Sequence, residues 1–238
     1  ESDRSPEDRE LREVLDLYHR HNGYFEHAQK VREFAVQIFD ATVDVHGMAH
    51  RVRRLLEYAA LLHDVGRSVV GVRDHEKQSY RIIMNNEFVE LSSREKRIVA
   101  AVALYHNGSQ QSLDRSKLWK LRSDEQTAVR RMAAILRIAD GLDASNKQVI
   151  DRLRISREDF GGTGNTSVVL DLNSVNNAKA EIKSVLAKKD LFEWEFNIPL
   201  VLDTHRLERS LSKGRNTKLN LFRENKPHGA ELFEDGEE

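Results

Sequence analysis

The chain contains no cysteine and only three prolines among its 238 residues. Without thiols it can form neither disulfide bonds nor thiolate metal sites, which is typical of a reducing compartment such as the cytoplasm. No apolar run reaches the roughly 18 residues of a membrane-spanning helix, so we expect no membrane association. The formal net charge of −1 gives no general attraction to nucleic acid. No signal peptide is visible, although the chain begins at Glu1 rather than Met.

The prolines stand at positions 6, 199 and 227, so residues 7–198 are free of the residue that most often breaks helices. Apolar residues recur at helical spacing through the first part of this stretch. Two Ser-x-x-Glu/Gln patterns, Ser92 with Glu95 and Ser123 with Gln126, resemble capping boxes at helix starts. We therefore expect a helical bundle over residues 7–147, with helices at 7–20, 25–43, 50–64, 75–85, from Ser92 to Tyr105, and from Ser123 to Asp140.

The pattern changes near residue 150. Residues 152–155 and 166–172 alternate apolar and polar side chains as half-buried strands do, with the turn 161–164 between them. A helix over 179–195 and an edge strand at 199–202 are expected to complete a small α+β unit over residues 150–203. Residues 204–238 are polar and predict a disordered tail. The expected fold class is thus mainly α, with a small C-terminal α+β unit.

Four residues combine imidazole and carboxylate groups with apolar helix faces. His27 lies on an inward stripe, His63 and Asp64 end one apolar run, and Asp140 ends another. Singly, these residues have structural interpretations, as a core histidine or as groups at helix ends. Together they predict a metal site, because a buried imidazole and carboxylate cost several kcal/mol unless each finds a partner. The donor set suits Mn²⁺, Fe²⁺, Co²⁺, Ni²⁺, Zn²⁺ or Mg²⁺.

Four further residues extend this hypothesis. His75 and His106 are candidates for a second metal or for the substrate phosphate, and Arg67 and Arg137 for holding phosphate oxygens. Water activated by the metal would attack phosphorus, with Asp64 and His63 as the catalytic pair. The other histidines are expected at the surface: His19, His21, His46, His50, His205 and His228.

The order His, His-Asp, Asp resembles the signature of the HD-domain superfamily of metal-dependent phosphohydrolases. More specifically, the chain resembles the C-terminal part of the Ppx/GppA exopolyphosphatase family over about residues 8–203. The resemblance implies an HD-type helical bundle with metal ligands at His27, His63, Asp64 and Asp140. The stretches that carry it are residues 27–31, 56–66, 75–80, 137–142 and 189–193.

Three differences from related sequences bear on the activity. Members of the family usually carry two actin-like domains before this part, to which their activity is assigned, and the phosphate-binding motifs of those domains are absent here. Gln78 stands where members often have a second histidine, which weakens the case for a complete second metal site. The run after Asp64 also lacks the acidic pair of SpoT-type alarmone hydrolases, which argues against hydrolysis of a 3′-diphosphate.

Two hypotheses from different classes therefore remain. The first is a metal-dependent phosphohydrolase acting on a phosphoester or phosphoanhydride of a nucleotide or polyphosphate. The second is a non-catalytic accessory module that binds a phosphorylated ligand or regulates a partner. Both predict a small phosphorylated ligand, and a homodimer is the assembly we expect. Nucleic acid is the weakest candidate partner, since only the basic segment 206–218 favours it.

Overall fold

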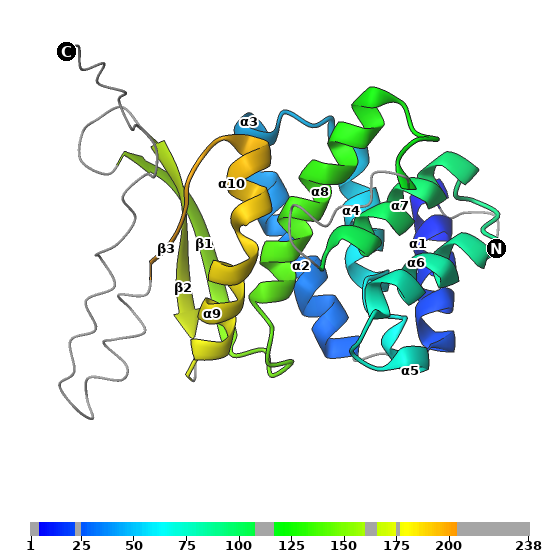
Figure 1. The fold of residues 1–238 in the computed structure, drawn as a ribbon, viewed down its shortest axis with the longest axis horizontal. Helices are drawn as coiled ribbons and strands as arrows, with labels where there is room; N and C mark the ends of the chain where they lie inside the picture. The colour runs from blue at the N-terminus through cyan, green and yellow to red at the C-terminus, as the bar shows by residue number, and fades with distance from the viewer. Residues whose placement is uncertain (1–4, 22–24, 108–116, 160–165, 175–176, 204–238) are drawn as a thin grey trace, which may run out of the picture.

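The computed structural model describes residues 5–21, 25–107, 117–159, 166–174 and 177–203. Its first part is a bundle of helices, and its second part is a small sheet with two helices (Figure 1). The bundle contains α1 (Pro6–Arg20), α2 (Phe25–Ala41), α3 (Val43–His46), η1 (His50–Val52), α4 (Arg53–Leu62), α5 (Arg67–Val70), α6 (His75–Asn85), α7 (Ser93–Tyr105) and α8 (Ser123–Gly141).

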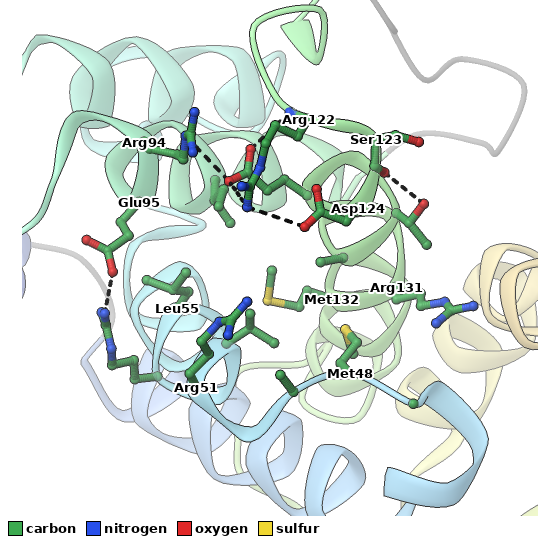
Figure 2. A pocket seen from close by; sticks show the side chains of 18 of the residues that line it. Met48, Arg51, Leu55, Arg94, Glu95, Arg122, Ser123, Asp124, Arg131 and Met132 are labelled. Atoms are coloured by element: carbon green, nitrogen blue, oxygen red, sulfur yellow. Dashed lines mark hydrogen bonds and ion pairs between the residues drawn. The ribbon is translucent and has the colours of Figure 1, made fainter.

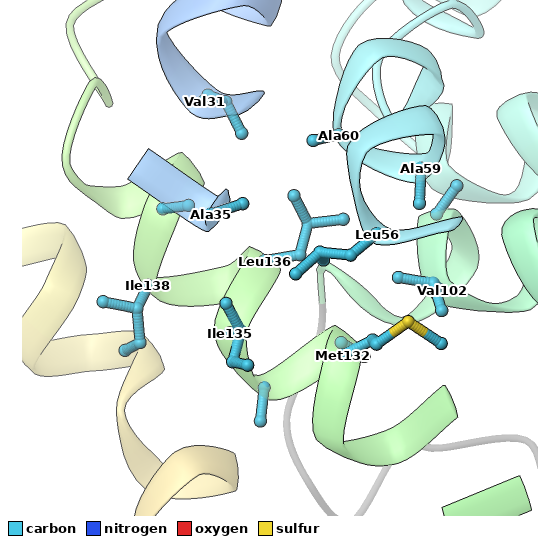
Figure 3. Packing of buried hydrophobic residues seen from close by; sticks show 14 of the residues in the cluster. Val31, Ala35, Leu56, Ala59, Ala60, Val102, Met132, Ile135, Leu136 and Ile138 are labelled. Atoms are coloured by element: carbon cyan, nitrogen blue, oxygen red, sulfur yellow. The ribbon is translucent and has the colours of Figure 1, made fainter. Parts of the chain in front are cut away.

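Helix α8 is the centre of the molecule. It packs against α2, α4 and α7 on one side and against α9 (Lys179–Lys188) and α10 (Asp190–Phe196) on the other. Every residue from Met132 to Gly141 is buried, as expected for a helix that is covered all round. In Figure 3, Met132, Ile135 and Leu136 of α8 lie among side chains of α2, α4 and α7. This core fixes the relative positions of the helix ends.

The C-terminal unit packs its helices between the sheet and α8 (Figure 1). Strand β1 (Ile150–Asp159) pairs antiparallel with β2 (Thr166–Ser174), and β2 pairs parallel with β3 (Leu200–Asp203). A parallel pair needs a long crossover connection, which α9 and α10 supply here. The predicted edge strand is confirmed at β3, whereas the turn expected at 161–164 and the tail 204–238 lie outside the described residues.

Most predicted elements are confirmed, with differences at their ends. Ser92 and Glu95 form the expected capping box at the start of α7. The prediction that Ser123 caps α8 is wrong, because Arg122 is the N-cap residue and Glu125 accepts its backbone N–H at 2.9 Å. The expected single helix over 179–195 is divided at Lys189 into α9 and α10.

Two further expectations are corrected. His46 is buried, not at the surface, because its ring accepts the Met48 N–H through Nδ1 at 2.9 Å and donates through Nε2 to the Phe39 carbonyl at 2.9 Å. The segment expected to be a loop between Gly66 and Gly71 contains the one-turn helix α5. None of the helices described is long and apolar enough to cross a membrane.

Candidate metal centre

The four residues of the predicted metal site come together at one end of the bundle. His27 comes from the first turn of α2, His63 and Asp64 follow α4, and Asp140 lies in the last turn of α8. The Nε2 atoms of both histidines lie 3.4 to 3.7 Å from Asp64 Oδ2 and Asp140 Oδ1. Donors bound at about 2.1 Å to one ion lie roughly 3 Å apart or slightly more, so this spacing fits a shared cation.

A second group of donors shares Asp64. The other carboxyl oxygen, Asp64 Oδ1, lies 3.1 Å from His75 Nε2 and 3.7 Å from His106 Nε2. The two Nε2 atoms of His75 and His106 are 3.1 Å apart. Both groups, His27–His63–Asp64 and Asp64–His75–His106, have the spacing needed to hold a metal ion. Asp64 therefore faces two candidate cation positions, one with each oxygen.

The four histidines are held in one orientation by their other ring nitrogen. Nδ1 of His63, His75 and His106 lies 2.6 to 2.7 Å from the backbone carbonyl three residues earlier, of Ala60, Val72 and Ala103 respectively. Nδ1 of His27 instead lies 2.8 Å from the carboxylate of Asp143. A carbonyl or carboxylate only accepts, so each Nδ1 carries hydrogen and each Nε2 is left to face the site.

Burial and charge set the protonation states. Burial disfavours the charged ring of His27, but the carboxylates of Asp140 and Asp143 outweigh it and raise its pKa to about 9. Burial lowers the pKa of His106 to about 3, so this ring is neutral. Burial also opposes the ionised form of Asp64, but His63 and His75 hold the pKa of its carboxyl well below the usual range. The site thus contains ionised carboxylates in contact with imidazoles of different charge.

Several donor atoms at this site have no hydrogen bond of good geometry. Within the part of the chain that is described, these buried atoms accept or donate no hydrogen bond, although charged groups lie near them: Nε2 of His27, Nε2 of His63 and both carboxyl oxygens of Asp64. Buried polar atoms are normally satisfied, and those left over need an explanation. The carboxyl ends of α4, α7 and α8 also point here, and their dipoles favour positive charge. The residues present therefore fit a divalent cation.

Comparison with protein families finds a match to the model described as Ppx/GppA phosphatase, domain III, over residues 10–209. The match covers most of the chain. The chain belongs to the Ppx/GppA phosphatase family. A comparison with curated proteins returns no match.

Gly66 lets α6 approach the His63-Asp64 segment. A Cβ at this position would lie 2.2 Å from the His75 carbonyl oxygen and 2.6 Å from the Ser79 backbone nitrogen. The Gly66 N–H also donates to Ser79 Oγ at 2.9 Å. This close approach places His75 beside Asp64, so the second donor group depends on a glycine two residues after the ligand.

Two residues at the site were missed by sequence reasoning. Asp143 is fully buried, orients His27, and accepts the Gln148 backbone N–H at 2.7 Å. Its position three residues after Asp140, just beyond the end of α8, was the available signal. Lys188 of α9 pairs with Asp140 Oδ2. No local pattern marks Lys188, because it reaches the site from a separate unit 48 residues further along the chain.

The two arginines predicted to bind phosphate have different positions. Arg67 Nε lies 2.9 Å from Asp64 Oδ2, and its side chain is 26% exposed at the edge of the site. Arg137 is buried under the C-terminal unit, where it donates to the Lys188 carbonyl at 3.2 Å and to Asp190 at 2.6 Å. The structure therefore brings Arg67 to the donor groups and joins Arg137 to the α9–α10 junction.

Tyr18 of α1 has a buried hydroxyl group without a partner among the described residues. Its ring contacts Phe25, two residues before His27, with centroids 5.5 Å apart. One turn later, His21 lies 3.4 Å from Ser68 Oγ, in the segment that follows Asp64. Burial, Glu26 and the charge of Asp64 raise the pKa of Tyr18 to about 12, so the phenol keeps its proton. Tyr18 thus lies beside the start of α2, which carries His27, and near enough to Asp64 for that charge to act on the phenol.

Replacing Asp143 with alanine should weaken metal binding by about 10- to 100-fold, because His27 loses the group that orients its ring. Isothermal titration calorimetry with Mn²⁺ would measure the dissociation constant. Asp151→Ala, at an exposed position of β1, is the matched control and should bind as the wild type does. Equal affinity in the Asp143 variant would contradict the role of Asp143.

The raised pKa of His27 predicts a pH dependence of stability without metal. Folding raises this pKa from an ordinary value near 6.5 to about 9, so the stabilisation is complete below about pH 6.5 and is lost as the pH rises to about 9. The free energy of unfolding of EDTA-treated protein should fall by about 3 kcal/mol over this window. Urea denaturation would measure it, and His27→Gln should reduce the slope. An unchanged slope in that variant would assign the effect to other groups.

Proposed function

We propose that this chain is a metal-dependent phosphohydrolase of the HD type, acting on a nucleotide or polyphosphate. Two divalent ions would be held, one by His27, His63, Asp64 and Asp140 and the other by Asp64, His75 and His106. Ions in these positions would supply Lewis-acid chemistry to a phosphoryl group. Membership in a phosphatase family supports the reaction class.

The observation that carries the proposal is the position of Asp64 between the two donor groups. Each carboxyl oxygen faces two imidazole Nε2 atoms whose Nδ1 atoms are already engaged. The Nε2 atoms of His75 and His106 are only 3.1 Å apart, which is unfavourable unless a proton or a cation lies between them. A structural core histidine would instead use both ring nitrogens in hydrogen bonds, as His46 does.

Cationic side chains at the edge of the site support phosphate as the substrate group. Arg67 and Lys188 pair with the ligand carboxylates Asp64 and Asp140, and their side chains are 26% and 23% exposed. A guanidinium and an ammonium on two sides of the donor groups can bind phosphoryl oxygens. Lys188 therefore takes the place that sequence reasoning gave to Arg137.

Tyr18 can add a neutral donor. Its hydroxyl remains protonated below about pH 12 and has no partner in the described structure. A buried hydroxyl without a hydrogen bond destabilises the fold. Donation to the substrate would explain why a tyrosine stands at this position. We therefore assign Tyr18 the role of a donor to a phosphoryl oxygen.

One observation favours the alternative, a non-catalytic module that binds a phosphorylated ligand. The matching family model describes a third domain of Ppx/GppA phosphatases, so the activity in that name can reside in other domains. The two functions share the ligand groups and differ in turnover. Measuring metal binding and hydrolysis on the same samples separates them.

Asp64→Asn should remove bound metal and abolish hydrolysis, because the carboxylate that faces both donor groups is lost while the side-chain size is kept. Elemental mass spectrometry would give the metal content after incubation with Mn²⁺. Phosphate release from p-nitrophenyl phosphate, nucleoside triphosphates and polyphosphate would give the activity. Asp151→Asn serves as the control and should match the wild type in both.

Three outcomes are distinguishable. Metal and hydrolysis in the wild type, both lost in Asp64→Asn, would support the enzyme. Metal without hydrolysis of any substrate would support the binding module. Equal metal content in wild type and Asp64→Asn would contradict the proposed centre.

Tyr18→Phe should lower the rate of phosphate release by about tenfold or more, since a donor to developing charge is removed. The same variant should be as stable as the wild type or more stable, because an unsatisfied buried hydroxyl is removed. Tyr58→Phe is the matched control. The Tyr58 hydroxyl donates to Glu10 at 3.1 Å, so its loss should cost about 1 kcal/mol of stability and leave the rate unchanged. Equal rates in wild type and Tyr18→Phe would exclude the assigned role.

A further inference from the structure

A cavity of about 880 Å³ opens at the end of the bundle opposite to the His/Asp groups. It is lined by the segment 47–52 and by the amino ends of α4, α7 and α8. The same three helices carry His63, His106 and Asp140 at or just beyond their carboxyl ends. Along α4 the two sites are separated by about 12 Å, the rise of eight helical residues. The cavity is therefore distinct from the candidate metal centre.

The floor of the cavity is apolar. Leu55, Ile98 and Met132 are buried core residues that also line it, and Met48 lies beside them (Figure 2). Its volume lies within the range of about 300–1,000 Å³ that is typical of small-molecule sites. Helix ends enclose it on several sides, which favours a small ligand over a protein surface.

The rim of the cavity carries an excess of positive charge. Five arginines and three carboxylates line it. The carboxylates are engaged: Glu95 pairs with Arg54, Glu125 lies 3.3 Å from Arg122 and 3.5 Å from Arg94, and Asp124 lies 3.3 Å from Arg122.

Arg51 is an exposed cation of this rim. Its side chain extends toward the middle of the hollow in Figure 2, and no carboxylate of the described residues lies within ion-pair distance of it. Arg131 extends away from the hollow and donates to the His46 carbonyl at 2.6 Å. The Arg51 guanidinium thus lies over an apolar floor, without an ion-pair partner among the described residues.

We infer that this cavity is a second ligand site, for a small organic anion with an apolar or planar body. The oxyanion would bind Arg51, with Arg94 and Arg122 nearby, and the body would cover Leu55 and Met132. The amino ends of α7 and α8 add favourable potential for an anion at the rim. A mononucleotide and a fatty acid share this chemistry. The site is independent of the proposed hydrolysis and needs no metal.

The test is calorimetric titration of the full chain with adenosine monophosphate and, separately, with decanoate. Both titrations are carried out in EDTA, so that phosphate cannot bind through a metal at the His/Asp groups. Arg51→Gln should weaken binding by about tenfold, because a charge-assisted contact is lost. Ala128→Phe, which fills the cavity from the surface of α8, should abolish it.

Two controls complete the design. Arg73→Gln removes an arginine whose side chain is 97% exposed and should bind as the wild type does, and so should Asp64→Asn. Binding of either probe that follows this pattern supports the site, and the probe that binds identifies the ligand class. Binding of neither probe, or equal binding by wild type, Arg51→Gln and Ala128→Phe, would overturn the inference. Because metal plays no part, either result is independent of the outcome for hydrolysis.

Discussion

The structure depends on how the buried carboxylate of Asp64 is neutralised. An ionised carboxylate away from water is tolerated only with strong partners, and Asp64 is surrounded by His27, His63, His75 and His106. These partners come from four different elements. The bundle must therefore hold the ends of several helices at fixed positions relative to one another. The apolar core around α8 fixes these positions, and Gly66 leaves the space in which α6 approaches.

The C-terminal unit contributes to the site as well as to the fold. Lys188 of α9 pairs with Asp140, and Arg137 of α8 is buried against the α9–α10 junction. A Cβ at Gly141 would lie 3.0 to 3.3 Å from Val185, so α8 and α9 approach closely at this point. Docking of the unit therefore sets the position of a cation beside a candidate metal ligand. The unit could not move away without changing the charge around Asp140.

Sequence patterns predicted the helices, the sheet and the donor residues, because each depends on local information. The apolar period locates helices, and His63 with Asp64 at the end of an apolar run is visible in the chain itself. Partners such as Lys188 could not be predicted, since tertiary packing alone brings α9 to Asp140. The burial of His46 was missed for a related reason, because a polar ring is stable inside only when backbone groups happen to lie within reach. The site roles of all these residues stay predictions.

The orientation of three helices gives the bundle two chemically different ends. The carboxyl ends of α4, α7 and α8 meet at the histidines and aspartates, where partial negative charge favours a cation. The amino ends of the same helices surround the cavity with its arginines, where partial positive charge favours an anion. Each end has its own charged groups. The apolar residues of α4 from Leu55 to Leu62 connect the two ends. A ligand that shifts Leu55 or Met132 at one end would act on helices that carry candidate metal ligands at the other.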